Sequence, residues 1–218
     1  MNLAVVLAVI LSIASAALFV DGPGAPIFGP SPHVDDSVIS STPSDVDADG
    51  TDETIEIAVA DGRLYEWPSP YCGDGERWEG SFEIRVRDGE ELLCSQSLNA
   101  LMAQDSLFFW TPQFEVELGD YNGDGLMDFN LMSSEGGCNG NHYRLFTIDR
   151  KGGVRSLSSR EFYAAPPHTN STSCIVGING LLGVISYSQE TGTYVADWYA
   201  WQDDDWILVR REAPYDPE

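Results

Sequence analysis

Two short stretches, residues 45–53 and 120–128, place acidic or amide side chains at every second position before a glycine. Crowded carboxylates repel one another unless a cation lies among them. Calcium prefers about six to eight oxygen ligands, and a turn with alternating acidic side chains directs such oxygens toward one centre. We therefore expect two calcium sites, one with the ligands Asp45, Asp47, Asp49 and Glu53 and the other with Asp120, Asn122, Asp124 and Asp128.

The first stretch also satisfies the formal EF-hand pattern, with a backbone ligand at Thr51 and Glu56 at the twelfth position. An EF-hand loop, however, lies between two helices. Here Pro43 and a Ser/Pro-rich segment precede the loop, and a β-type alternation follows it. The second stretch has Leu131 where an EF-hand requires glutamate. We therefore predict that both loops lead into strands.

Apolar and polar residues alternate along most of the chain from about residue 45 to residue 213, which is typical of β-strands. In residues 81–95 this alternation is followed by Asp88-Gly89, a pair suited to a type I′ hairpin turn. Residues 54–67 alternate in the same way, and we predict a second turn at Asp61-Gly62. Further strands are expected at 107–110, 114–118, 143–148, 184–188, 194–201 and 206–209, with a short helical turn near 97–104. The expected fold is mainly β, built of antiparallel sheets.

The stretch GDYNGDGLMDFNL, residues 119–131, resembles the calcium loops of FG-GAP/VCBS repeats, in which D-x-N-x-D-G-x-x-D leads into a strand. Both loops of this chain resemble that pattern, and they are 75 residues apart. In FG-GAP/VCBS proteins such loops bind calcium within the blades of β-propellers. The resemblance therefore implies calcium as the bound ion, and a fold that is either partly β-propeller-like or a sandwich with two strand-entry loops.

The second half of the chain is similar to a group of small periplasmic bacterial proteins, some of which inhibit peptidoglycan hydrolases or confer immunity to them. The similarity covers about 95 residues and rests on a Y-x-x-F-x-x-D hairpin and an aromatic-rich final hairpin. It implies an exported inhibitor, such as a lysozyme inhibitor, that binds a protein partner. The matching residues are Tyr143, Phe146 and Asp149 in the first hairpin and Trp198, Tyr199, Trp201 and Trp206 in the second.

Residues 1–20 are apolar, carry no charged side chain and contain Ala14-Ser15-Ala16, which favours a cleaved signal peptide over a retained N-terminal anchor. Residues 21–44 are rich in Pro, Gly and Ser, which predicts a disordered linker before a β domain at 45–213. We therefore expect a periplasmic or secreted protein, or one at the cell surface.

Four cysteines in an exported chain favour disulfides, and the alternative is four buried free thiols. Three pairings exist. The local one, Cys72 with Cys94 and Cys138 with Cys174, has the shortest loops and is preferred here, although the sequence alone leaves the choice open.

The chain carries 35 acidic and 11 basic residues, a net charge of −24. A phosphate backbone is repelled by such a surface, so general nucleic-acid binding is excluded. Cations and basic partners are attracted, among them a basic cell-wall hydrolase. An acidic surface adapted to a salty environment explains the same composition equally well.

No histidine lies in a recognisable nucleophile or metal-ligand pattern, so we expect no enzymatic activity. The aromatic segment 194–206 has two interpretations, a platform that stacks on sugars or cross-strand packing, and packing explains most of it. The first functional hypothesis is thus a calcium-stabilised inhibitor or immunity protein. The alternatives are a cell-surface adhesion or glycan-binding module and a degenerate enzyme.

Overall fold

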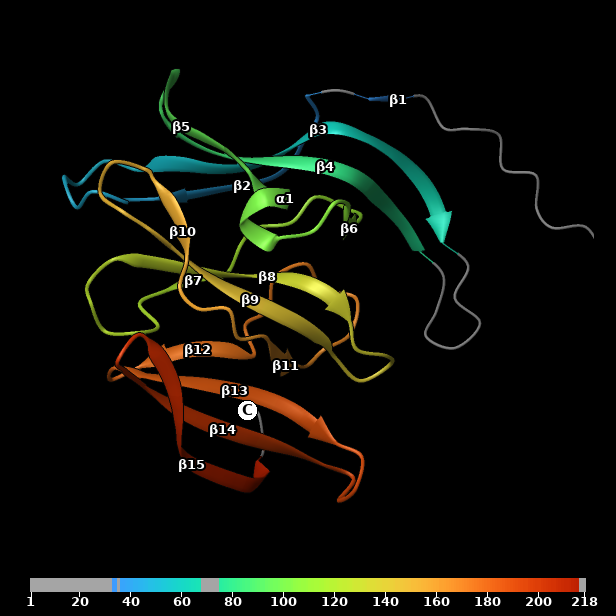
Figure 1. The fold of residues 1–218 in the computed structure, drawn as a ribbon, viewed down its shortest axis with the longest axis vertical. Helices are drawn as coiled ribbons and strands as arrows, with labels where there is room; N and C mark the ends of the chain where they lie inside the picture. The colour runs from blue at the N-terminus through green and yellow to red at the C-terminus, as the bar shows by residue number, and fades with distance from the viewer. Residues whose placement is uncertain (1–32, 35, 68–74, 216–218) are drawn as a thin grey trace, which may run out of the picture.

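The computed structural model describes residues 33–34, 36–67 and 75–215. Strands make up 61% of the structure and helix 3%, and the strands form three antiparallel sheets. The predicted mainly β, antiparallel fold is therefore confirmed. The three sheets follow one another from the top to the bottom of Figure 1, and the described residues do not close into a barrel or a propeller.

The first sheet, sheet A, contains six strands, and β2–β3–β4–β5 form an antiparallel meander within it. Helix α1 (Leu98–Met102) follows the fifth strand and is capped by Ser97, whose hydroxyl accepts a hydrogen bond from the Ala100 backbone N–H. The strands are β1 (His33–Val34), β2 (Val38–Ser44), β3 (Glu53–Trp67), β4 (Gly75–Asp88), β5 (Glu91–Ser97) and β6 (Leu107–Trp110).

Sheets B and C repeat the same four-stranded meander. Sheet B consists of β7 (Leu118–Gly119), β8 (Met127–Glu135), β9 (Asn141–Ile148) and β10 (Val154–Ser156), with β11 (Phe162–Ala164) paired to β9. Sheet C consists of β12 (Ile175–Ile178), β13 (Leu181–Ser188), β14 (Thr193–Gln202) and β15 (Asp205–Tyr215).

Sheet B lies between two hydrophobic cores. Its strand β8 is buried at six consecutive positions, because both faces of the sheet are covered. Phe129 and Leu131 pack with sheet A, whereas Met132 packs with sheet C. Alternate residues of one strand therefore join the three layers.

Two local predictions of the fold are wrong. Asp61-Gly62 does not turn the chain: β3 continues through it with a bulge, and Gly62 pairs with Gly80 of β4. Pairing with the long neighbouring strand overrides the local turn preference. The strand predicted at 114–118 is reduced to β7, preceded by an isolated bridge between Ser40 and Phe114.

The predicted linker also extends too far toward the C-terminus. Strands β1 and β2 belong to sheet A, and Ile39 and Thr42 of β2 are buried. The Ser/Pro-rich composition of this segment favoured disorder, although its inward-facing residues are buried in the sheet. The remainder of the linker and the predicted signal segment, residues 1–32, lie outside the described residues.

The preferred cysteine pairing is wrong as well, because Cys94 and Cys174 are both free thiols. Cys138 is disulfide-bonded, and Cys72 lies outside the described residues. Among the described residues, no helix is long and apolar enough to cross a membrane.

Candidate metal centres

The two acidic loops occupy equivalent positions in the first two sheets. The first joins β2 to β3, and the second joins β7 to β8; both pairs of strands are antiparallel. Glu53 is the first residue of β3, and Asp128 is the second residue of β8. The prediction that the loops lead into strands is therefore confirmed, and the flanking helices of an EF-hand are absent at both described loops.

In the first loop, the carboxylates accept hydrogen bonds from the loop's own backbone. Both oxygens of Asp45 are used, one by the Asp49 N–H at 3.0 Å and the other by the Gly50 N–H at 3.0 Å. Asp47 accepts from the Asp49 N–H at 3.0 Å. These bonds hold the side chains of Asp45 and Asp47 on the inside of one turn.

The second loop repeats these bonds position by position. Asp120 accepts from the backbone N–H groups of Asp124 at 3.1 Å and Gly125 at 3.1 Å, and Asn122 accepts from Asp124 at 3.0 Å. Gly125 has a φ of +78°, in the region that glycine occupies without strain. Two loops 75 residues apart thus adopt one hydrogen-bonded conformation.

The ninth position closes each loop in the same way. Glu53 accepts a hydrogen bond from the Val46 N–H at 2.7 Å, and Asp128 accepts one from the Tyr121 N–H at 2.8 Å. Glu53 and Asp128 are both buried. The carboxylate at the strand entry therefore reaches back beneath the loop in both sheets.

The carboxylate oxygens of the first loop are close enough to share one ion. One oxygen from each of Asp45, Asp47 and Asp49 lies within 4.8 Å of the others. Oxygens bound at about 2.3–2.6 Å from a common calcium ion lie at most about 5 Å apart. The donor set, all oxygen and mostly anionic, fits calcium better than zinc or copper.

Asp128 is the most unusual acid of the two loops. It is fully buried, and burial raises the pKa of its carboxyl to about 6, with smaller contributions from the charges of Asp124 and Asp120. Its Oδ1 has no hydrogen-bond partner of acceptable geometry among the described residues. The hydroxyl of Thr147, on the paired residue of β9, offsets part of the pKa rise but is itself without such a partner. A buried carboxylate with one oxygen left without a hydrogen bond is costly unless a cation compensates its charge.

The second loop also touches sheet C. A Cβ atom placed on Gly177 of β12 would lie 2.3 Å from the Asp120 carbonyl oxygen, so the two backbones are in close contact. The equivalent hairpin of sheet C, between β12 and β13, contains only Asn179 and Gly180 and carries no acid. The second loop therefore fills the space beside a shorter turn.

We expect Gly177→Ala to weaken calcium binding at the second loop and to leave the first loop unaffected. The added methyl group collides with the backbone of Asp120, so the loop must shift, and the strain costs about 1–3 kcal/mol of stability. Calorimetric titration of calcium measures both affinities in one experiment. Gly89→Ala is the control, because its Cβ meets open space and its positive φ alone costs about 1 kcal/mol. Equal calcium affinities in Gly177→Ala and the wild type would contradict the expectation.

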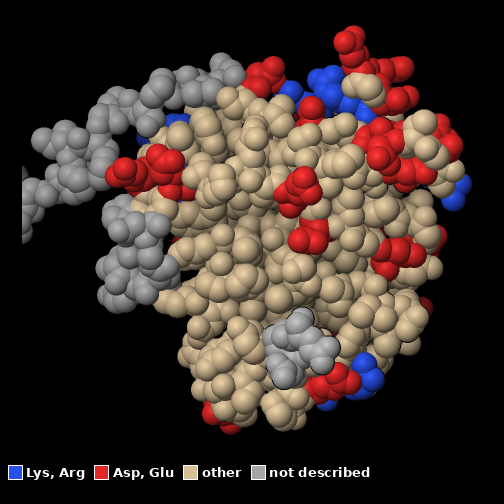
Figure 2. Space-filling model, turned by 180° about the vertical axis from the view of Figure 1, so that it is seen from behind, with Lys and Arg blue, Asp and Glu red and all other residues tan. Residues whose placement is uncertain are grey.

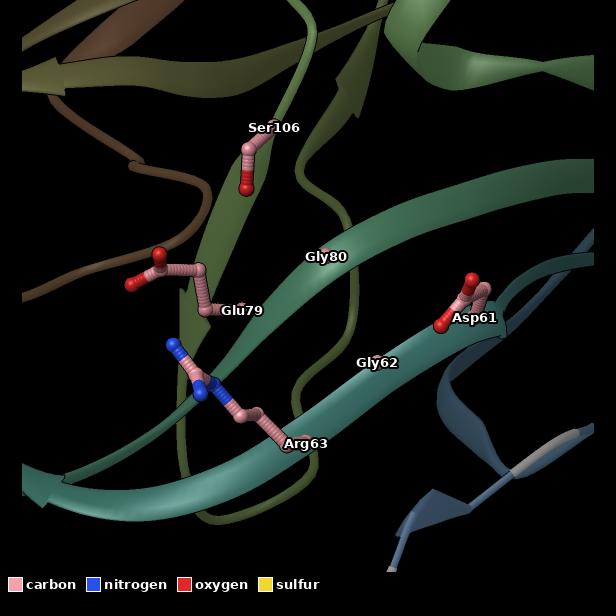
Figure 3. A pocket seen from close by; sticks show the side chains of 6 residues that line it. All are labelled: Asp61, Gly62, Arg63, Glu79, Gly80 and Ser106. Carbon is pink, nitrogen blue, oxygen red and sulfur yellow. The ribbon is translucent and has the colours of Figure 1, made fainter.

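One surface recess of about 200 Å³ lies where β3 and β4 bend. Figure 3 shows Arg63 and Glu79 on one side of it and Asp61 at the other. The bend requires glycine, since a Cβ on Gly80 would lie 2.1 Å from the Asp61 carbonyl oxygen. Glu79 already accepts hydrogen bonds from the Tyr65 hydroxyl and the Arg77 guanidinium. The recess is therefore explained by the bend and its internal ion pairing.

A second recess, of about 230 Å³, lies between β6 and the segment after β11. His168 stacks on Trp110 at a centroid distance of 5.0 Å. The Asn170 side-chain oxygen accepts a hydrogen bond from the backbone N–H of Trp110, and its amide nitrogen donates one to the backbone carbonyl of Trp110, both at 2.8 Å. These contacts tie sheet A to the chain that enters sheet C, which is a packing role.

The residues that carry the resemblance to the periplasmic proteins are structural. Tyr143 and Phe146 are fully buried, one in each core, and Asp149 accepts backbone hydrogen bonds within the β9–β10 turn. Of the aromatic hairpin, Trp198, Tyr199 and Trp206 are buried and Trp201 is half-buried. Packing accounts for the buried side chains of this set.

Sequence reasoning missed two residues that shape the second loop, Thr147 and Gly177. Thr147 faces Asp128 only because β8 and β9 pair in one register, and Gly177 meets Asp120 only because sheets B and C pack together. No local signal marks either residue.

No protein family, curated protein or solved structure matches this chain.

Proposed function

We propose that both loops bind calcium and that the ions stabilise the β scaffold rather than act in signalling or catalysis. The observation that carries the proposal is the hydrogen-bond frame that the two loops share, together with the second oxygen of buried Asp128, Oδ1, which has no hydrogen-bond partner among the described residues. Calcium would neutralise acids that otherwise repel one another. Its ligands would be Asp45, Asp47, Asp49 and Glu53 in the first site, and Asp120, Asn122, Asp124 and Asp128 in the second.

The scaffold itself supports a propeller-like interpretation. A propeller blade is a four-stranded antiparallel meander, and three such meanders follow one another here. We propose that they are three blade-like repeats, of which the first two retain a calcium loop. The third has a short turn at the same place.

We propose further that this scaffold is an exported binding protein whose partner is a basic peptidoglycan hydrolase. Two observations support this role: the net charge of −24 and the resemblance of the second half to inhibitors and immunity proteins. In Figure 2, most of the acidic side chains on the visible face lie in its upper and middle parts. Such a surface speeds the encounter with a basic enzyme at low salt. Because five of the seven resembling residues are buried, the partner would contact mainly other side chains.

Inhibition of lysis tests this role. The calcium-loaded protein is expected to slow the clearing of a peptidoglycan suspension by a basic lysozyme, in proportion to its concentration and less strongly at high salt. A panel of basic and acidic hydrolases provides the comparison. Unchanged lysis with every basic enzyme would contradict the role, and retention on peptidoglycan without any enzyme would favour the glycan-binding alternative.

A further inference from the structure

The two end sheets expose different outer faces. Sheet A buries the apolar residues of β3 and β4 and directs the alternate, charged residues outward. There Arg85 pairs with Asp36 at 2.6 Å and with Glu83 at 3.1 Å, and Arg87 pairs with Glu56 at 3.0 Å. The outer face of sheet A is therefore polar and suited to contact with water, as the terminal repeats of stacked structures require.

Sheet C has an apolar outer face instead. Leu182, Val184 and Tyr199 point into the core, so by strand alternation and register their neighbours point away from it. Trp198 also lies on the outer side of the sheet, with its ring flat over Gly183. A Cβ atom added to Gly183 would be 2.8 Å from that ring. We define the apolar face as Ile178, Leu181, Ile185, Tyr187, Tyr194 and Ile207.

Much of this face is in contact with solvent. Ile178 is 47% exposed, Ile207 46% and Tyr194 37%. Sheet C is the last layer in Figure 1, and no described element lies beyond it. An apolar surface of this extent on an end sheet indicates an interaction site.

The charges on the apolar face neutralise each other. Arg210 lies over Trp198 at 4.9 Å and forms an ion pair with Glu212 at 3.2 Å. On the side seen in Figure 2, most of the described surface in the lower part of the molecule, where sheet C lies, is uncharged, and the charged side chains lie at its edges. A basic partner would be drawn to the acidic surfaces elsewhere, whereas two copies of this −24 chain repel each other least through this face.

We infer that the apolar face binds a second copy of this chain, face to face, in a symmetric dimer. Four strands about 4.8 Å apart, each about eight residues long at about 3.3 Å per residue, cover about 400–500 Å². Two such faces bury about 800–1,000 Å², which is near the lower limit for a specific interface. The dimer is therefore weak and depends on concentration.

Sedimentation velocity of the calcium-loaded protein, from about 1 µM to about 500 µM, tests this inference in the range expected for a small interface. The wild type is expected to shift from monomer to dimer, and to do so at lower concentration when salt screens the net charge. Ile207→Glu is expected to weaken association at least tenfold, because each copy would bury a carboxylate.

Leu92→Glu is the matched control. Leu92 lies on β5, which pairs with one strand only among the described residues, as β15 does, and both Leu92 and Ile207 are 46% exposed. This variant is expected to associate like the wild type, and circular dichroism checks that both variants fold. A wild type that stays monomeric at every concentration overturns the inference. The occupant of the face would then be something other than a second copy of this chain. Equal loss of association in both variants also overturns it.

Discussion

Removal of calcium is expected to lower the thermal unfolding midpoint of this protein by about 10–20 °C. An ion present at about 100 times its dissociation constant stabilises the folded state by about 2.7 kcal/mol per site, so two sites give about 5 kcal/mol. For a domain of this size, each kcal/mol shifts the midpoint by about 2–4 °C. Scanning calorimetry in calcium and in excess chelator measures the difference.

Loop variants separate specific binding from a general effect of salt. Asp45→Asn and Asp120→Asn each keep one oxygen for the loop's backbone N–H groups, replace the other oxygen with an amide nitrogen and remove one ligand charge. Each single variant is expected to lose about half of the calcium-dependent shift, and the double variant nearly all of it. Magnesium is expected to replace calcium poorly, because it requires a smaller octahedral site. An equal midpoint with and without chelator in the wild type would refute the stabilising role.

Asp128→Asn is expected to stabilise the protein in chelator and to destabilise it in calcium. Without metal, the folded-state pKa of Asp128 is raised from 3.8 to about 6, because the charged form is buried. The folded state then binds the proton more tightly than the unfolded state, so stability is highest below about pH 4 and falls as the pH rises to about 6. The loss is about 3 kcal/mol at most for a shift of this size. Asparagine carries no charge, so in chelator at pH 7 the variant is expected to be the more stable protein.

In saturating calcium the order is expected to invert, since the variant lacks an anionic ligand. Urea unfolding at pH 4 and pH 7, with calcium or chelator, provides the four stabilities. The control is Asp124→Asn, an exposed acid of the same loop. It is expected to weaken calcium binding without the gain in chelator, because charge at an exposed position costs little. Equal destabilisation of Asp128→Asn in both conditions would show that Asp128 is only a structural hydrogen-bond acceptor.

The fold was predictable from sequence wherever local pattern and tertiary pairing agree. Strand β6 has the predicted bounds, 107–110, and the helical turn near 97–104 contains α1. The chain turns at Gly89-Glu90, one residue after the start of the predicted Asp88-Gly89 turn, and only Gly89 has a positive φ, whereas Asp61-Gly62 lies inside a strand. The two dipeptides are alike, and the difference comes from the partner strand, since Gly62 faces a glycine on β4. Such information lies in the pairing and is absent from the dipeptide.

The candidate site was predictable as two sets of residues but not as an electrostatic environment. The spacing of Asp120, Asn122 and Asp124 was enough to place them in one turn, and the structure holds them there by backbone hydrogen bonds. The burial of Asp128 depends on a sheet packed on each side of β8, which no single segment encodes. The predicted cysteine pairing was wrong for a related reason, because the separation of two cysteines in the sequence does not show whether the fold brings their thiols together.

Calcium stoichiometry tests the central claim most directly. Native mass spectrometry and calorimetric titration of the metal-free protein are expected to show two bound calcium ions per chain, falling to one in Asp45→Asn or Asp120→Asn. No bound calcium in the wild type, or two ions still bound when both aspartates are replaced, would contradict the account.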